Sequence, residues 1–451
     1  RQRDGGDGPG ELNMDFARGW IGLEPGPYER LVGFVNYERS DNSYDEPAGI
    51  PPFNNSTAKH NLLAFGFASH EFGARNVLTL GGGYGDKTTD GLNRDLNPQP
   101  SPSLIASGFA QDSRFAFAAA RYARSAGRLD MEAGIEAIWF RATNNLYDLY
   151  DLDQFGIVKF DDISTSRFRQ QRYYADARWS PRGSLILEGQ VAWVDSRLTR
   201  DGTNFFRVDD LTPTDTAALD FRLGAAFEPA RGHWLRGAFL RETSSEVPFT
   251  FAPTGAIGLR GNIAPVTFGG QSDSAILRWD AEWNAHVFTS VEFQHQAFGA
   301  LVIPTSDDQA YVGFRNARID RLRGTVNVWP GGNFGLAATY AWARGHGDEL
   351  VSPGFVHDTL PYLPGHFAQG SVSWTSPARV KIEVHESWSA NQRDFFHVVR
   401  PASFLTDAEL TWEPLDKRIE LAVSVENIFA TENTPRFSLG RIVSATLAFR
   451  F

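Results

Sequence analysis

An alternation of apolar and polar residues, repeated along almost the whole chain, is the feature that most constrains the fold. It occurs in "LDMEAGIEAIW" (129–139), "AILRWDAEW" (275–283), "RIELAVSVEN" (418–427) and the final "RIVSATLAFRF" (441–451). A period of two is that of a β-strand, in which successive side chains point to opposite faces. The sequence therefore predicts an all-β protein whose strands have one apolar and one polar face.

Composition excludes several classes of protein. No run reaches the roughly 18 to 20 apolar residues of a membrane-spanning helix. The chain has no Cys, which excludes disulfides, thiolate metal sites and cysteine nucleophiles. A net charge of −11 without a basic patch argues against a nucleic-acid partner. The first residue is Arg1 and no apolar leader follows it, so we interpret the sequence as a processed chain or a fragment.

The Trp residues separate two interpretations of the alternation. A water-soluble sandwich buries its apolar faces, whereas a transmembrane barrel turns them toward lipid. Here the apolar faces often end in Trp, as they do at the interfacial aromatic girdle of a membrane barrel. A packed core with so many bulky ends would be hard to fill. The predicted girdle consists of Trp139, Trp179, Trp283, Trp342, Trp374, Trp388 and Trp412.

The connections between strands favour the barrel as well. Tight turns such as "SPRG" (180–183) and "PGGN" (330–333) alternate with long connections such as Thr143 to Ser166 and Thr243 to Gln271. Outer-membrane barrels have short periplasmic turns and long extracellular loops. We therefore expect residues 30–451 to form a transmembrane antiparallel up-and-down β-barrel of about 18 strands, within roughly 16 to 22. Residues 1–29 would form a periplasmic N-terminal segment or an extra strand.

The end of the chain resembles a known family. The stretch "VENIFATENTPRFSLGRIVSATLAFRF" (425–451) is similar to the end of TonB-dependent receptors, and "LPYLPGHFAQGSVSW" (360–374) resembles a strand opening of the same family. The alternating last strand, with Phe449 and a terminal Phe451, also resembles the assembly signal read by the outer-membrane insertion machinery. The positions that match the receptor ending are Asn427, Phe429, Gly440, Arg441 and Phe451.

The resemblance implies a location in the outer membrane of a Gram-negative bacterium, in contact with the lipid bilayer, lipopolysaccharide and the insertion machinery. Receptors of this family take up siderophores or other large nutrients, and they have an N-terminal plug, an energy-coupling protein and 22 strands. Only about 29 residues precede the first expected strand here. A second group with similar closing strands follows a periplasmic tetratricopeptide repeat scaffold and exports polysaccharide. We therefore expect a porin-like or export channel for polar solutes or a polysaccharide, or alternatively a receptor barrel with its plug outside this chain.

Charged residues on the polar faces would line the passage. Arg344 is left out because it shares a face with Trp342. An acidic surplus in a confined pore would favour cationic or neutral solutes, although mutually paired charges would have no such effect. The predicted acids are Asp130, Glu132, Glu136, Asp176, Glu188, Asp220, Asp280, Glu282, Glu292, Glu383, Asp407, Glu409, Glu420 and Glu426. The predicted basic residues are Arg172, Arg178, Arg222, Arg278, Arg323 and Lys381.

Signals for catalysis are weak. "LGGGYG" (80–85) has the glycines of a phosphate loop but no Lys-Ser/Thr after it, so a glycine-rich strand is the better interpretation. His295 and His385 stand alone on expected strands, and no nucleophile has a base at a fixed spacing. Aromatic and acidic residues in "NNLYDLYDLDQFGIVKFDD" (144–162) fit either sugar binding or loop packing. We expect no cofactor and no metal, and a barrel enzyme is a remote alternative.

Overall fold

In the computed structural model, all regular secondary structure of the described residues is β-strand. No helix among them is long and apolar enough to cross a membrane. The described residues are 2–4, 10–46, 53–73, 75–95, 103–151, 157–202, 215–243, 250–261, 270–304, 311–349, 360–393, 399–414, 419–429 and 441–449.

The chain divides into two compact units, each built from consecutive antiparallel strands. Unit 1 comprises Arg1–Trp179, Gly189–Phe221 and Thr243–Thr254. Unit 2 comprises Ser180–Glu188, Arg222–Glu242 and Gly255–Phe451. Strands β8, β9, β10 and β11 each have residues in both units.

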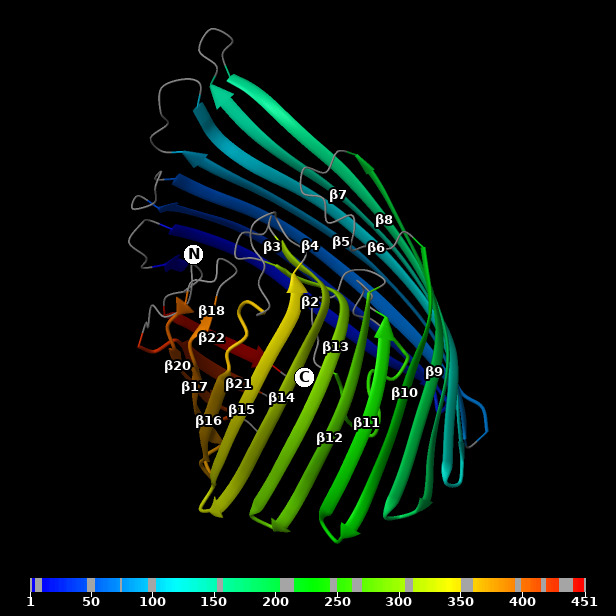
Figure 1. The fold of residues 1–451 in the computed structure, drawn as a ribbon. Coiled ribbons are helices and arrows are strands. Elements are labelled where there is room, and N and C mark those ends of the chain that lie inside the picture. The colour runs from blue at the N-terminus through cyan, green and yellow to red at the C-terminus, as the bar shows by residue number, and fades with distance from the viewer. Residues whose placement is uncertain are drawn as a thin grey trace. The chain divides into compact units, whose positions relative to one another are not determined.

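In unit 1, each strand from β1 to β8 pairs with the next one along the chain (Figure 1). This up-and-down order needs only hairpin connections, because antiparallel neighbours can be joined directly. The strands are β1 (Gln2–Asp4), β2 (Gly10–Gly26), β3 (Glu29–Glu46), β4 (Phe53–Glu71), β5 (Asn76–Asp95), β6 (Ser103–Ala126), β7 (Leu129–Asp151), β8 (Ile157–Arg182), β9 (Leu185–Gly202) and β10 (Asp215–Ala230).

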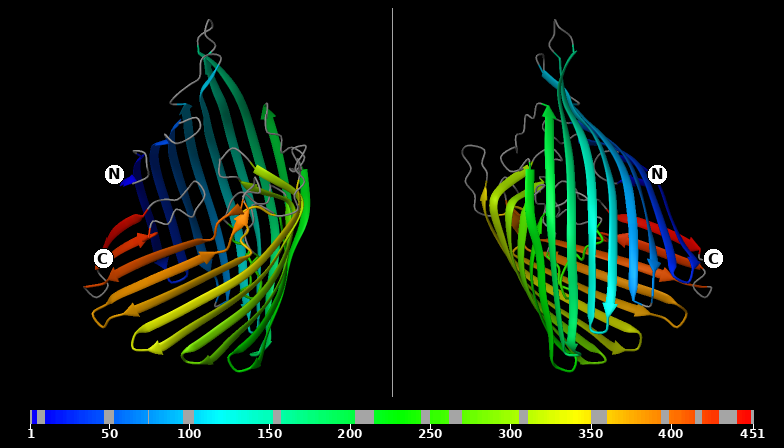
Figure 2. Two further views of the ribbon diagram at one scale, coloured as in Figure 1. Left: turned by 60° about the vertical axis from the view of Figure 1, so that its left-hand side comes forward. Right: turned by 90° about the vertical axis from the view of Figure 1, so that its right-hand side faces the viewer.

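Unit 2 repeats this order from β12 to β17 and then through β20, β21 and β22 (Figure 2). A separate ribbon is formed by β18 (Gln392–Arg393) and β19 (Val399–Arg400). The other strands are β11 (His233–Thr243), β12 (Gln271–Asn284), β13 (Val287–Pro304), β14 (Tyr311–Gly331), β15 (Phe334–Glu349), β16 (His366–Thr375), β17 (Val380–Ser389), β20 (Ser403–Trp412), β21 (Ile419–Glu426) and β22 (Ile442–Phe449).

The strand count agrees with the sequence. Twenty strands of the described residues belong to the main antiparallel sheet, within the range of roughly 16 to 22 that we expected. The strands of this sheet from residue 29 onward are β3 to β17 and β20 to β22, and their number agrees with the expected number of about 18. The leading segment contributes β2, which pairs with β3 from Leu23↔Leu31 to Glu11↔Ser43.

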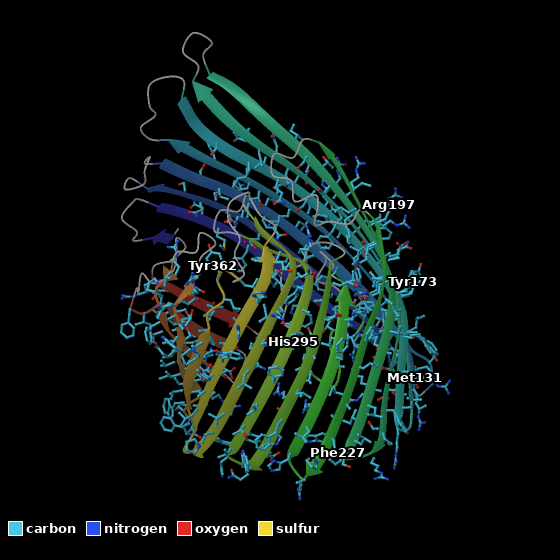
Figure 3. All side chains as sticks on the ribbon, in the orientation of Figure 1. Met131, Tyr173, Arg197, Phe227, His295 and Tyr362 are labelled. Carbon is cyan, nitrogen blue, oxygen red and sulfur yellow. The ribbon has the colours of Figure 1, made fainter. Side chains whose placement is uncertain are left out.

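The two faces of the strands differ in an unusual way. The apolar face is the exposed one: Leu277 on β12 is 64% exposed and Ile135 on β7 is 43% exposed. The polar face is the covered one: Glu136 on β7 and Gln294 on β13 are each 1% exposed. Figure 3 labels Met131 and Tyr173, which both lie on the exposed face of unit 1. A water-soluble sandwich has the reverse arrangement, so this distribution is that of a sheet with its apolar face toward a non-aqueous environment.

Several strands are longer than the sequence indicated. The expected long connection from Thr143 to Ser166 is mostly strand, because β7 continues to Asp151 and β8 begins at Ile157. The ladder continues through pairs such as Thr143 and Thr165, whose hydroxyl groups lie 3.3 Å apart. The expectation of a loop was wrong here because both faces of these strand ends mix apolar and polar residues, as at the adjacent Leu146 and Tyr147, so the alternation that identifies a strand disappears.

The exposed apolar face generates a first prediction. Val372 lies on this face of β16, two residues before Trp374 and opposite Leu336 and Val384. If this face meets hydrocarbon, Val372→Arg lowers the free energy of unfolding in phospholipid vesicles by about 1–2 kcal/mol, between the cost at the midplane and that at the interface, measured by urea titration. Ser371→Arg, one residue away on the polar face, is the matched control and costs less. Equal losses for the two variants would contradict the assignment of the faces.

Candidate functional site

Buried ion pairs define the polar face of unit 1. The Arg172 guanidinium lies 3.8 Å from the Glu136 carboxylate and 3.7 Å from the Asp220 carboxylate. All three side chains are buried, and an unpaired buried charge would be costly. A further pair joins Arg121 and Glu132 at 3.6 Å. The structure therefore brings three of the predicted residues, Glu136, Arg172 and Asp220, into contact, and the sequence gave no sign that one arginine lies between the two acids.

The remaining predicted charges of unit 1 lie on the same face of β7 and β8. In the register of these two strands, Asp130 is opposite Arg178 and Glu132 is opposite Asp176. Opposite charges in directly facing positions attract, so the first of these pairs stabilises the sheet.

Unit 2 has a denser cluster of arginines around Glu292. The Glu292 carboxylate lies 3.3 Å from Arg323, 3.6 Å from Arg278 and 3.7 Å from Arg321. Four cations therefore surround two acids, because Arg278 and Arg236 also contact Asp280, at 2.7 and 3.1 Å.

Sequence reasoning missed part of this network. Arg236 and Arg321 were not among the predicted residues, nor was Glu242, which pairs with Arg222 at 2.9 Å. The period of two could have identified these three residues, because each lies an even number of positions from another residue of the polar face in the same strand. With them included, the acidic surplus is smaller than the sequence implied. Ion selectivity stays a prediction.

The other predicted charges of unit 2 are spread over several strands. Lys381 pairs with Glu383 at 2.7 Å, and Glu383 faces Glu409 of β20. The Asp407 carboxylate accepts a hydrogen bond from the backbone N–H of Asn427 at 2.8 Å. Predicted residues elsewhere in this unit are Glu188 on β9, Glu282 on β12, and Glu420 and Glu426 on β21.

The segment from Thr250 to Gly261, between β11 and β12, is attached to the polar face, and we call it the inner segment. Its first part lies in unit 1, where the Glu136 carboxylate accepts hydrogen bonds from the Thr250 hydroxyl at 2.7 and 2.9 Å. The same carboxylate accepts the backbone N–H groups of Phe251 and Ala252, the latter at 3.1 Å. Glu136 therefore has an anchoring role that its position in the sequence does not reveal.

A glycine on β5 makes room for the aromatic ring of the inner segment. Phe251 packs edge-on against Phe67 and Phe117, with ring centroids 6.4 and 6.0 Å apart. A Cβ added to Gly81 would lie 2.4 Å from the Phe251 ring, which is closer than atoms can approach. The glycine run 81–83 belongs to a strand, as the sequence favoured, and Gly81 serves as a notch for this ring.

The second part of the inner segment lies in unit 2 and forms a tight turn. Ala256 and Leu259 exchange two backbone hydrogen bonds, of 3.0 and 2.8 Å, around Ile257 and Gly258. Both central residues have positive φ, 47° for Ile257 and 78° for Gly258. This backbone region is unfavourable for a β-branched residue, so contacts must hold Ile257 there. The Glu188 carboxylate accepts the Ile257 N–H at 3.1 Å.

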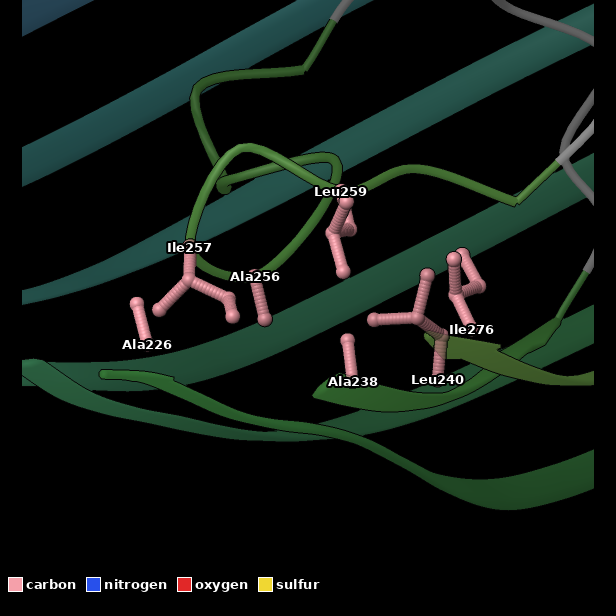
Figure 4. Packing of buried hydrophobic residues seen from close by; sticks show 7 residues of the cluster. All are labelled: Ala226, Ala238, Leu240, Ala256, Ile257, Leu259 and Ile276. Carbon is pink, nitrogen blue, oxygen red and sulfur yellow. The ribbon is translucent and has the colours of Figure 1, made fainter. Parts of the chain in front are cut away.

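Apolar packing also holds the turn at Ile257 in place. Ala256, Ile257 and Leu259 pack against a patch of buried residues on unit 2 strands (Figure 4). The patch includes Leu240 and Ile276, which are 0% and 2% exposed although they lie on the polar face. The other members of the cluster are Ala226 and Ala238.

A second glycine notch, Gly224 on β10, receives this turn. A Cβ at Gly224 would lie 2.8 Å from a side-chain carbon of Ile257. Apolar residues at polar-face positions, such as Leu240 and Ile276, together with the apolar "FAPTGAIGL" (251–259), are the sequence signals that could have identified the inner segment.

The predicted Trp residues lie near both ends of the exposed apolar face. Trp179 faces Leu129 where β7 begins, and Trp139 lies at the other end of the apolar stretch of β7. Trp283, Trp374 and Trp412 lie at hairpin ends like Trp179, whereas Trp342 and Trp388 lie at the opposite ends of their strands. Their role as an interfacial girdle stays a prediction. The proposed assembly signal lies outside the description, since Phe451 and the Phe449 side chain are not among the described atoms.

The two histidines that the sequence singled out each face an aspartate. His295 contacts Asp320 through Nδ1 at 2.6 Å on the apolar side of β13 and β14, and His385 faces Asp407 in the register of β17 and β20. Within the described ranges, no group of three or more His, Asp or Glu residues could hold a metal ion.

No protein-family model matches the chain, and no curated protein sequence matches it. Solved structures do match. The siderophore receptor PiuA from Acinetobacter baumannii aligns with a TM-score of 0.72 at 10% identity, over 99% of this chain and 76% of the receptor. The ferric-catecholate import receptor Fiu from Escherichia coli aligns with a TM-score of 0.67 at 12% identity, over 99% and 75%. The ferric yersiniabactin uptake receptor FyuA from Yersinia pestis aligns with a TM-score of 0.68 at 12% identity, over 96% of this chain and 69% of the receptor.

At these identities the likeness establishes the fold. The chain has the antiparallel up-and-down β-barrel fold of these receptors, which confirms the fold class expected from the alternation and the loops. The resemblance of its last strands to TonB-dependent receptor barrels is confirmed as a resemblance of fold.

The anchoring of the inner segment can be tested with a single cysteine, because the chain has none of its own. Ala252 is buried, so Ala252→Cys should react slowly with a water-soluble maleimide. Adding Gly81→Ala places a Cβ against the Phe251 ring and should speed labelling about tenfold, the effect of overpacking by roughly 1–3 kcal/mol. Gly19→Ala is the control, since its Cβ would have no atom within 4 Å. Equal rates in the two backgrounds would show that the notch does not hold the segment.

Proposed function

We propose that this chain is the barrel of an outer-membrane receptor that takes up a siderophore or another large nutrient. The observation that carries the proposal is the fold match to several siderophore receptors along almost the whole chain. These matches support the receptor interpretation better than an open porin-like or export channel, and they support transport better than catalysis.

The distribution of side chains supports the location in the outer membrane. An exposed apolar face with Trp at both ends matches the lipid-facing band of a membrane barrel. A covered polar face with internally paired charges matches a wall that faces a water-filled passage. In this proposal the phospholipids and lipopolysaccharide of the membrane contact the apolar face.

The inner segment supports a restricted passage rather than an open one. A polar-face loop that is held by Glu136 and Glu188 occupies space that solutes would otherwise use. In this proposal, a plug and an energy-coupling protein take part in opening the passage, as the resemblance to TonB-dependent receptors implies.

Ligand binding tests the receptor proposal directly. The purified chain in detergent would be titrated with ferric catecholate, hydroxamate and carboxylate siderophores, and binding would be followed by quenching of its Trp fluorescence. We expect saturable binding of one class at micromolar concentration or below, with weaker binding of the iron-free form. Failure of all three classes, together with a large stable conductance, would instead favour the porin-like channel.

Conductance in planar lipid bilayers tests the restriction. Glu136→Gln removes the charge that holds Thr250, Phe251 and Ala252, and Gly81→Ala displaces the ring of Phe251. We expect the double variant to conduct more than the parent chain, because a detached inner segment leaves more open area. Gly19→Ala should conduct like the parent. An unchanged conductance in a correctly folded double variant would contradict the restriction.

A further inference from the structure

The arginine cluster of unit 2 carries more positive than negative charge. Four guanidinium groups share two carboxylates, and the next acid on the polar face of β12, Glu282, lies one step nearer the hairpin that leads to β13. In unit 1 the balance is reversed, because Arg172 lies between two acids. The cluster of unit 2 consists of Arg236, Arg278, Arg321, Arg323, Asp280 and Glu292.

The acids of this cluster lie deeper than its arginines. The Glu292 side chain is 10% exposed, whereas Arg323 is 36% exposed and Arg278 is 28% exposed. Asp280 is likewise less exposed than Arg236 and Arg278, which contact it. Guanidinium groups therefore form the outer surface of the cluster, and the carboxylates form its base.

Small residues border the two arginines of β14. In the register of β14 and β15, Arg321 faces Ala343 and Arg323 faces Ala341. An alanine side chain carries no charge and is too short to cover a neighbouring guanidinium group. Nε of Arg321 is also buried without a hydrogen-bond partner in the part of the chain that the structure describes. Buried donors in folded proteins are normally paired, so this one needs an acceptor from another source.

The charges of the following strands are too far away to balance the surplus. In the described parts of β15 and β16 the polar-face residues are uncharged, as at Thr339 and Gln369, which face each other. Farther along the sheet, Lys381 and Glu383 on β17 pair with each other at 2.7 Å. Three strand spacings of about 4.8 Å separate β14 from β17, which is more than the Debye length of about 8 Å in physiological salt.

We propose that Arg321 and Arg323, with Arg278, bind anionic oxygen atoms of the transported ligand, so that this receptor takes up negatively charged ferric complexes. Guanidinium groups bind pairs of anionic oxygens through parallel N–H donors. Positive charge on the wall of a confined passage attracts anions and repels cations. The inference rests on the proposed receptor function and adds the charge class of the ligand.

This charge class separates the main types of siderophore. A ferric complex of three catecholates is a multiply charged anion, because both oxygens of every catecholate are ionised. Carboxylate siderophores also form anionic ferric complexes. A ferric complex of three hydroxamates is neutral, because each hydroxamate brings a single negative charge to the ferric ion. The arginine surface therefore favours the catecholate and carboxylate types over the hydroxamate type.

Fluorescence titration of the detergent-purified full chain tests this preference. The parent chain should bind a ferric tris-catecholate at least about tenfold more tightly than a ferric tris-hydroxamate. Arg323→Gln should weaken binding of the catecholate complex about tenfold, because one charge-assisted contact is lost, and should leave hydroxamate binding unchanged. Glu292 keeps Arg278 and Arg321 as partners in this variant. A ferric carboxylate complex, titrated in parallel, shows which of the two anionic types is the ligand.

Two further variants serve as controls. Arg323→Lys keeps the positive charge without the paired donors, so it should lose less affinity than Arg323→Gln. Lys381→Gln removes one positive charge from β17 on the same polar face and should leave the affinity for the catecholate complex unchanged. Every variant must show the heat-modifiable gel band of a folded barrel, and Arg323→Lys replaces Arg323→Gln in the comparison with Lys381→Gln if the latter arginine variant does not fold.

Tighter binding of the hydroxamate complex, or an equal loss of affinity with the Arg323 variant and with Lys381→Gln, would overturn the inference and leave the receptor proposal intact. A parent chain that binds none of the three siderophore types contradicts the receptor proposal, and the inference is then wrong as well.

Discussion

The structure depends on an antiparallel ladder in which each strand satisfies its backbone N–H and C=O groups from the strands beside it. The register between β13 and β14, from Val287↔Val328 to Pro304↔Tyr311, shows how far such a ladder continues. Hydrocarbon has no hydrogen-bond partner for the backbone, so only a ladder of this kind allows an apolar face to be exposed to it. Once neighbouring strands are in register, the period of two assigns every side chain to one face.

The polar face then has to balance its own charges, since it is largely covered. Arg172 between two acids and Glu292 among three arginines are two such solutions. The Glu136 carboxylate also accepts backbone N–H groups of the inner segment, and these hydrogen bonds are a third way of balancing a charge on this face. The Glu188 carboxylate, which accepts the Ile257 N–H, and the apolar cover together keep Ile257 in an unfavourable backbone conformation. Charge balance and segment placement are therefore parts of one network.

Much of the fold could be predicted from particular residues. The alternation in 129–139 and 418–427 identified strands and their faces correctly, because the pattern reflects a period that the backbone imposes. It failed at Asn144 and beyond, where apolar and polar residues are mixed on both faces of the strand and no alternation remains. The candidate site was less predictable. The alternation along the strand placed Glu136 on the polar face. Its hydrogen-bond partner Thr250 is 114 residues away in the sequence, and no local pattern indicates that the two residues meet.

The sequence by itself determined the strands, their two faces, the approximate strand number and the positions of the Trp residues, because each of these follows from spacing along the chain. Only the tertiary structure decided which charges meet, that Gly81 and Gly224 are notches for the inner segment, and that Arg321 and Arg323 face alanines of β15. These features depend on the register between strands and on contacts between distant residues. Register and distant contacts arise when the strands pair and the loop packs, and a single strand contains neither.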